Sequence, residues 1–91
     1  MAVYIYSALL VSEEGKYNVS FPDLKDCYTC GDDIQDSLKM ARDALAGYLT
    51  RQEDRHLEIP EATNPMGILV PDNAIHTLID VDTDAYRRMR K

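Results

Sequence analysis

Two cysteines are the first residues in this 91-residue chain whose type and spacing could support chemistry. Cys27 and Cys30 have the C-x-x-C spacing of many metal and redox sites, but zinc needs four ligands and the sequence holds no second pair. A redox pair normally has its first thiol at a helix N-terminus, whereas the helix here is expected about two residues after Cys30. We therefore expect one buried and one near-surface cysteine, with no metal and no cofactor.

The two histidines, His56 and His76, are the next candidates for chemistry. Neither has a serine or cysteine close to it in sequence. General-base catalysis needs a nucleophile or a substrate proton within hydrogen-bonding distance. The pattern favours two surface histidines over a catalytic pair, and we predict no catalytic residues.

Five aspartates crowd one region, and three interpretations compete for Asp23, Asp26, Asp32, Asp33 and Asp36. A two-metal nuclease needs carboxylates that converge on ions about 4 Å apart. A structural interpretation makes Asp32 the N-cap of a helix and places Asp33 and Asp36 in its first turn. As a third interpretation, the five carboxylates form an anionic face that binds a basic partner, and we predict this partner-binding role.

The distribution of charge supports a basic protein partner more than a nucleic acid. The net charge is −6, but residues 1–86 hold six basic and sixteen acidic side chains, and residues 87–91 (Arg-Arg-Met-Arg-Lys) hold four basic ones. Phosphate binding needs clustered Lys and Arg, so DNA binding is not expected. An acidic body attracts a basic partner, although acidity alone also serves solubility.

The elements that position these residues can be predicted from their patterns. Val3–Val11 is rich in β-branched and aromatic residues, which predicts a strand that is apolar on both faces. Lys16–Phe21 alternates and should form a hairpin with it. Cys27–Cys30 is a short third strand. From Asp33 to about Asp54, apolar residues recur at helical spacing, with Asp32 as the N-cap.

The remainder of the chain completes an α+β fold. His56–Asn73 contains three of the four prolines, which predicts a loop. Ala74–Val81 is a final strand, and a short helix follows through Arg90. The order β-β-β-α-β, with one main helix packed on one face of an antiparallel sheet, predicts one domain over residues 1–91. Val3–Val11 lacks a basic flank and is too short to span a bilayer, so we expect a cytoplasmic protein.

One helix cannot cover both faces of such a sheet, and an exposed apolar face is often an interface. We therefore predict a homo-oligomer, a dimer or a tetramer. The interface is expected at the first strand and its neighbour, through Tyr4, Tyr6, Ala8 and Tyr17.

Several of these segments together resemble the HicB antitoxin family. They are G-K-Y-N-V-S-F-P-D-L at 15–24, C-Y-T-C-G-D at 27–32, S-L-K-M-A at 37–41, I-P-E-A at 59–62 and L-I-D-V-D-T-D-A-Y at 78–86. Asp26 stands where the family usually has Gly, and Ser37 replaces a common Ala. The resemblance implies a partial ribonuclease-H-like fold, homo-oligomerisation and binding of a small basic HicA-type ribonuclease. Many members continue into a DNA-binding module, which is not seen before Lys91.

Three hypotheses on function follow. The first is an antitoxin-like binding module, not an enzyme, whose acidic body occludes a basic ribonuclease. The second is an RNA-binding or nuclease-like protein that uses the ribonuclease-H-like fold. The third is a stand-alone oligomeric HicB-like domain of unknown partner.

Overall fold

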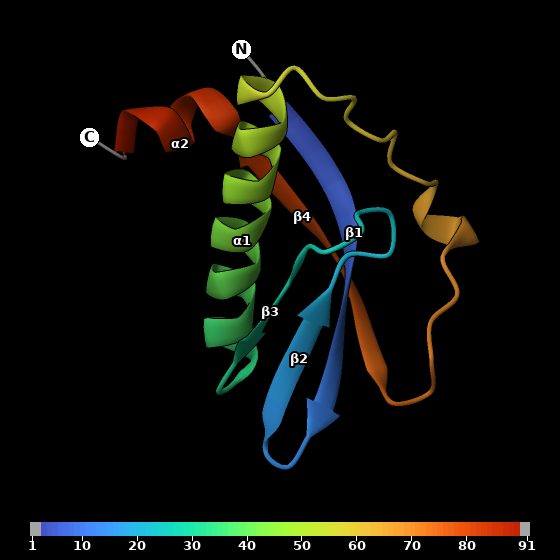
Figure 1. Ribbon diagram of the computed structural model, residues 1–91. Helices are drawn as coiled ribbons and strands as arrows, with labels where there is room; N and C mark the ends of the chain where they lie inside the picture. Colours follow the sequence, from blue (N-terminus) through green and yellow to red (C-terminus); the bar gives the residue numbers. More distant parts are fainter. Residues whose placement is uncertain (1–2, 90–91) are drawn as a thin grey trace.

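The computed structural model describes residues 3–89 and confirms the predicted α+β fold (Figure 1). The elements are β1 (Val3–Glu13), β2 (Lys16–Ser20), β3 (Tyr28–Gly31), α1 (Ile34–Asp54), the short 3-10 helix η1 (Pro65–Gly67), β4 (Ala74–Asp82) and α2 (Thr83–Met89). None of the described helices is long and apolar enough to cross a membrane.

The four strands form one antiparallel sheet in the order β3-β2-β1-β4. A two-residue turn joins β1 to β2, and its residues Glu14 and Gly15 have φ of 52° and 83°. Two successive positive φ values match the right-handed twist of a tight hairpin. β1 also pairs with β4 along nine residues, so β3 and β4 are the edges of the sheet.

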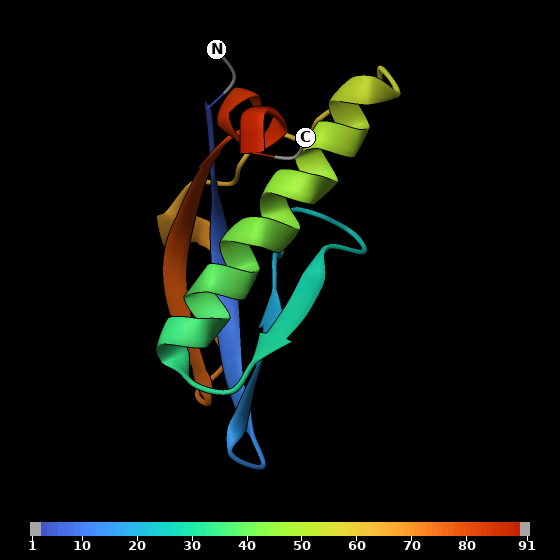
Figure 2. The same ribbon diagram turned by 90° about the vertical axis from the view of Figure 1, so that its left-hand side faces the viewer.

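The core lies between α1 and one face of the sheet (Figure 2). Alternate residues of β1, namely Tyr6, Ala8 and Leu10, are buried on this side, because side chains in a strand point to opposite faces in turn. α1 contributes Leu45 and Leu49, which are fully buried and lie four residues apart on one side of the helix.

α1 begins one residue later than predicted, because its N-cap is Asp33 and not Asp32. The Asp33 carboxylate accepts a hydrogen bond from the backbone N–H of Asp36 at 2.7 Å, and the Asp36 carboxylate accepts one from the N–H of Asp32 at 3.0 Å. Two acidic side chains thereby satisfy backbone donors at the helix start, as in a capping box.

The connection between α1 and β4, residues 57–73, crosses the sheet face opposite α1 (Figure 1, Figure 2). Two contacts hold its first part. The Tyr6 hydroxyl donates to the carbonyl of Pro60, and the Asp23 carboxylate accepts from the backbone N–H and the hydroxyl of Thr63 at 2.8 and 2.5 Å. On this second face the β1 residues Ser7 and Leu9 are 1% and 9% exposed, so part of the face is covered by the chain itself.

Candidate partner-binding surfaces

The five aspartates predicted as a partner surface lie in two separate places. Asp32, Asp33 and Asp36 are at the N-terminus of α1, whereas Asp23 and Asp26 lie in the loop between β2 and β3. Asp32 lies six positions after Asp26 along largely extended chain, which corresponds to about 20 Å. The five carboxylates therefore do not form one continuous face.

The β1–β2 hairpin brings two further acidic residues to the group at the start of α1. Tyr17 in β2 pairs with Gly31 in β3, and Figure 1 shows the hairpin tip at the same end of the molecule as the start of α1. We call this region the acidic end; it comprises Glu13, Glu14, Asp32, Asp33 and Asp36. Sequence reasoning missed Glu13 and Glu14 because only the pairing of the strands places the hairpin tip at the same end of the molecule as the start of α1.

Few cations neutralise the acidic end. The Lys16 ammonium lies 3.7 Å from the Asp32 carboxylate, but both side chains are largely exposed, so this ion pair is weak. Glu13 accepts a hydrogen bond from the Asn18 amide at 2.5 Å. The end therefore retains a negative field that favours a basic partner.

The carboxylates do not converge as a two-metal nuclease requires. Asp23 binds Thr63, and Asp33 and Asp36 cap α1. Within residues 3–89, no group of three or more Asp, Glu, His or Cys side chains could hold a metal ion.

The two cysteines have different environments, as predicted. Cys27 is buried in the core and its sulfur lies 4.0 Å from the carbonyl oxygen of Ala44. Burial raises the pKa of the Cys27 thiol to about 11. Cys30 is an exposed free thiol on the edge strand β3.

One histidine has a partner that the sequence did not reveal. His56 is exposed, but His76 is only partly exposed, and its Nε2 lies 2.9 Å from the hydroxyl oxygen of Ser7. The two residues are far apart in sequence and meet because β1 pairs with β4. Ser7 is 1% exposed, so its hydroxyl is closed to a substrate and the contact ties two strands together.

Of the four residues predicted as an oligomer interface, two lie in the core and two are partly buried at its margin. Tyr6 and Ala8 are buried beneath α1, and Tyr4 and Tyr17 pack against the same cluster. Both residue sets of β1 are apolar, so the sequence alone did not show which set faces α1. A second copy of the chain cannot reach Tyr6 and Ala8 in this fold.

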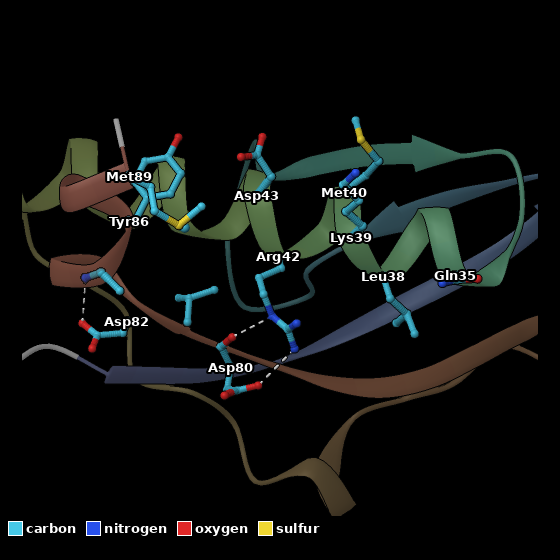
Figure 3. A pocket seen from close by; sticks show the side chains of 13 residues that line it. Gln35, Leu38, Lys39, Met40, Arg42, Asp43, Asp80, Asp82, Tyr86 and Met89 are labelled. Atoms are coloured by element: carbon cyan, nitrogen blue, oxygen red, sulfur yellow. Dashed lines mark hydrogen bonds and ion pairs between the residues drawn. The ribbon is translucent and has the colours of Figure 1, made fainter. Parts of the chain in front are cut away.

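A groove of about 770 Å³ lies between α1, the end of β4 and α2 (Figure 3). Arg42 closes one side of it, because its guanidinium donates to the Asp80 carbonyl at 3.2 Å and to the Asp80 carboxylate at 3.3 Å. The lining is mainly apolar and comes from all three elements: Leu38, Met40, Ala46, Val81, Ala85, Tyr86 and Met89.

α2 is fixed against α1 by a network centred on Glu53. The Glu53 carboxylate accepts from the Tyr4 hydroxyl at 2.8 Å, the Thr83 hydroxyl at 3.1 Å and the Arg87 guanidinium at 3.0 Å. Arg87 also donates to Asp54 at 2.7 Å. Burial opposes ionisation of Glu53, but the three hydrogen bonds outweigh it and hold the pKa of this carboxyl below its ordinary value.

The comparison with protein families identifies the chain. A family model described as the HicB-like antitoxin of bacterial toxin–antitoxin systems matches residues 6–91. The chain belongs to this family. No curated protein sequence matches it, so the HicB-like family is the level at which sequence places it.

Solved structures share this HicB-like fold at low sequence identity. A chain from a toxin–antitoxin complex of Streptococcus pneumoniae has a TM-score of 0.84 at 20% identity, with 93% of this chain and 73% of that chain covered. The N-terminal domain of Burkholderia pseudomallei antitoxin HicB gives 0.71 at 19%, covering 87% and 99%. A chain from a HicA3–HicB3 toxin–antitoxin complex gives 0.72 at 19%, also covering 87% and 99%.

Proposed function

We propose that this protein is the antitoxin of a toxin–antitoxin pair and neutralises a small basic HicA-type ribonuclease by occlusion, without catalysing a reaction itself. The observation that carries the proposal is the HicB-like family match over residues 6–91. Chains of the same fold occur in toxin–antitoxin complexes, which supports a protein partner of this class.

The acidic end is the surface that best suits a basic ribonuclease. Glu13, Glu14, Asp32 and Asp33 are exposed there, and Lys16 is the cation that lies against them. A ribonuclease must carry a positive surface to bind RNA phosphates. Carboxylates on this surface would attract the enzyme and cover the path that RNA needs, so binding and inhibition have the same physical origin.

A charge-neutralising variant tests this role. The antitoxin is co-expressed with the small basic protein encoded by the reading frame beside its gene, and growth and complex formation are measured. The variant Glu13→Gln, Glu14→Gln, Asp32→Asn leaves the cap residues intact. We expect at least a tenfold weaker complex, mainly through slower association and a smaller dependence of the association rate on salt.

The matched control removes the same charge from the connection between α1 and β4. Glu58→Gln, Glu61→Gln, Asp72→Asn alters three exposed side chains away from the acidic end, and we expect unchanged affinity. If both triple variants bind equally well, the acidic end is not the interface. If the wild-type protein neither binds the basic protein nor restores growth, the antitoxin proposal fails. Metal-dependent RNA cleavage by the isolated chain would favour the nuclease hypothesis instead.

A further inference from the structure

The groove between α1, β4 and α2 leaves apolar side chains open to solvent. Figure 3 shows Gln35 and Leu38 at one end of it and Tyr86 and Met89 at the other. Met40 and Met89, which both line the groove, are 38% and 83% exposed. Apolar surface gathered in a concave place is often a binding site, so the groove is a candidate for an occupant.

The length of the groove matches a short helix. Its α1 wall runs from Gln35 to Ala46, which is about 16 Å or three helical turns. Apolar side chains from three elements surround this length, namely Leu38 from α1, Val81 from β4 and Ala85 from α2. An amphipathic helix fills such a groove with apolar residues at positions i, i+3, i+4 and i+7.

The backbone of β4 beside the groove is not open to a strand. The Asp80 carbonyl accepts a hydrogen bond from the Arg42 guanidinium at 3.2 Å, and the Asp80 carboxylate accepts a second one at 3.3 Å. β4 ends two residues later, where α2 begins at Thr83. An added strand needs free backbone groups along the edge, whereas a helix satisfies its own backbone groups internally. The groove therefore suits a helix better than an extended segment.

Charge indicates which kind of helix the groove accepts. Three aspartates line it, Asp43, Asp80 and Asp82, against the two cations Lys39 and Arg42. The Arg42 charge is already paired with Asp80. The groove also begins at the first turn of α1, which belongs to the acidic end. Basic residues beside the apolar face of the occupant would therefore meet opposite charge.

We propose that this groove holds an amphipathic helix of the basic ribonuclease. The apolar face of that helix packs on Leu38, Val81 and Met89, and its basic flank faces Asp43 and the acidic end. This inference rests on the proposed antitoxin function and adds an apolar part to the same interface. The acidic end attracts the toxin, and the groove slows its release.

Two neutral double variants test the groove on the full chain. Met40→Gln, Met89→Gln makes the groove polar without changing its charge. The control Met66→Gln, Leu69→Gln alters two apolar side chains on the connection between α1 and β4, which are 93% and 92% exposed. Association and dissociation rates are measured with the basic protein encoded beside the gene. We expect at least a tenfold faster dissociation for the groove variant, a nearly unchanged association rate, and no change for the control.

Photocrosslinking shows whether the occupant is a helix. A benzophenone amino acid replaces Met40 in one protein and Met89 in another, and the residues of the basic protein joined to each probe are identified by mass spectrometry. We expect them to lie three, four or seven positions apart in one segment. Crosslinked residues two positions apart indicate a strand and overturn the proposal.

The remaining outcomes separate this proposal from the antitoxin function. If the wild-type protein binds the basic protein and both double variants dissociate at the same rate, the groove is not part of the interface and the antitoxin function stands. If the groove variant changes only self-association in sedimentation velocity, the groove belongs to a second copy and the proposal is wrong. If the wild-type protein forms no complex, both proposals fail together.

Discussion

Replacing Gly31 by alanine tests how closely β3 approaches α1. A Cβ atom at Gly31 would lie 2.4 Å from the hydroxyl oxygen of Ser37 and 2.6 Å from its Cα and backbone nitrogen. Two of these atoms are backbone, so a side-chain rotation cannot relieve the overlap. The backbone of α1 or β3 must move by about 0.8 Å to reach an ordinary contact of 3.4 Å.

The cost of this movement can be estimated. Overpacking in a well-packed site costs about 1–3 kcal/mol. The same shift disturbs the Asp33 cap and the hydrogen bond from the Ser37 hydroxyl to the Asp33 carbonyl at 2.6 Å, and losing a cap costs about 0.5–2 kcal/mol. The reduced freedom of the unfolded chain returns about 0.4–1 kcal/mol. We expect Gly31→Ala to lower the free energy of unfolding by about 2–3 kcal/mol.

Urea unfolding followed by circular dichroism measures this loss, with Gly67→Ala as the control. A Cβ atom at Gly67 would lie 3.6 Å from the Thr63 methyl carbon, an ordinary contact, so the control should change stability by less than about 0.5 kcal/mol. If Gly31→Ala is as stable as Gly67→Ala, with an unchanged dependence on urea, the close approach of α1 to β3 is refuted.

Three further predictions concern the carboxylate network, the thiols and the helix contact. Because the folded pKa of Glu53 is depressed, its stabilisation is present above about pH 4.3 and is lost as pH falls through the folded pKa. Glu53→Gln should therefore cost about 1–2 kcal/mol at pH 7, and urea titrations should show this cost shrinking as the pH is lowered. An alkylating reagent should label Cys30 in the native protein and Cys27 only after unfolding, so equal labelling rates would contradict the burial of Cys27. A Cβ atom at Gly47 would lie 3.1 Å from the Tyr86 hydroxyl, which is a tight contact. Gly47→Ala should therefore show the roughly 1 kcal/mol gain of alanine over glycine in a helix only when Tyr86→Phe removes that hydroxyl. Thermal melting of the single and double variants measures this difference.

Local patterns were sufficient to predict most of the elements. The alternation of Tyr17 and Val19 predicted β2, and the helical spacing of Ala41, Leu45 and Leu49 predicted α1 within one residue of its start. Each of these signals is short in range, because it depends on which face of one strand or helix is buried.

The contacts that depend on pairing between distant segments could not be predicted. β1 is apolar on both faces, so the set containing Tyr6 and the set containing Ile5 were equally plausible candidates for the core. The Ser7–His76 hydrogen bond and the position of Lys16 beside Asp32 follow from strand register, which no single segment encodes.

The departure at Asp26 from the usual family glycine has a local explanation. Asp26 adopts a φ of 68°, in the left-handed region that favours glycine but tolerates aspartate better than most residues. The unusual residue therefore keeps the turn and adds a charge to the loop before β3.

The long connection between α1 and β4 has a consequence for the order of folding. β1, β2, β3 and α1 are joined by short turns, so their contacts can form early. The β1–β4 pairs, from Val11 with Ala74 to Val3 with Asp82, must wait for closure of a large loop. Until then β1 is itself an open edge that can capture β4 from another nascent chain, and exchange of β4 between chains is the misassembly to which this topology is most exposed.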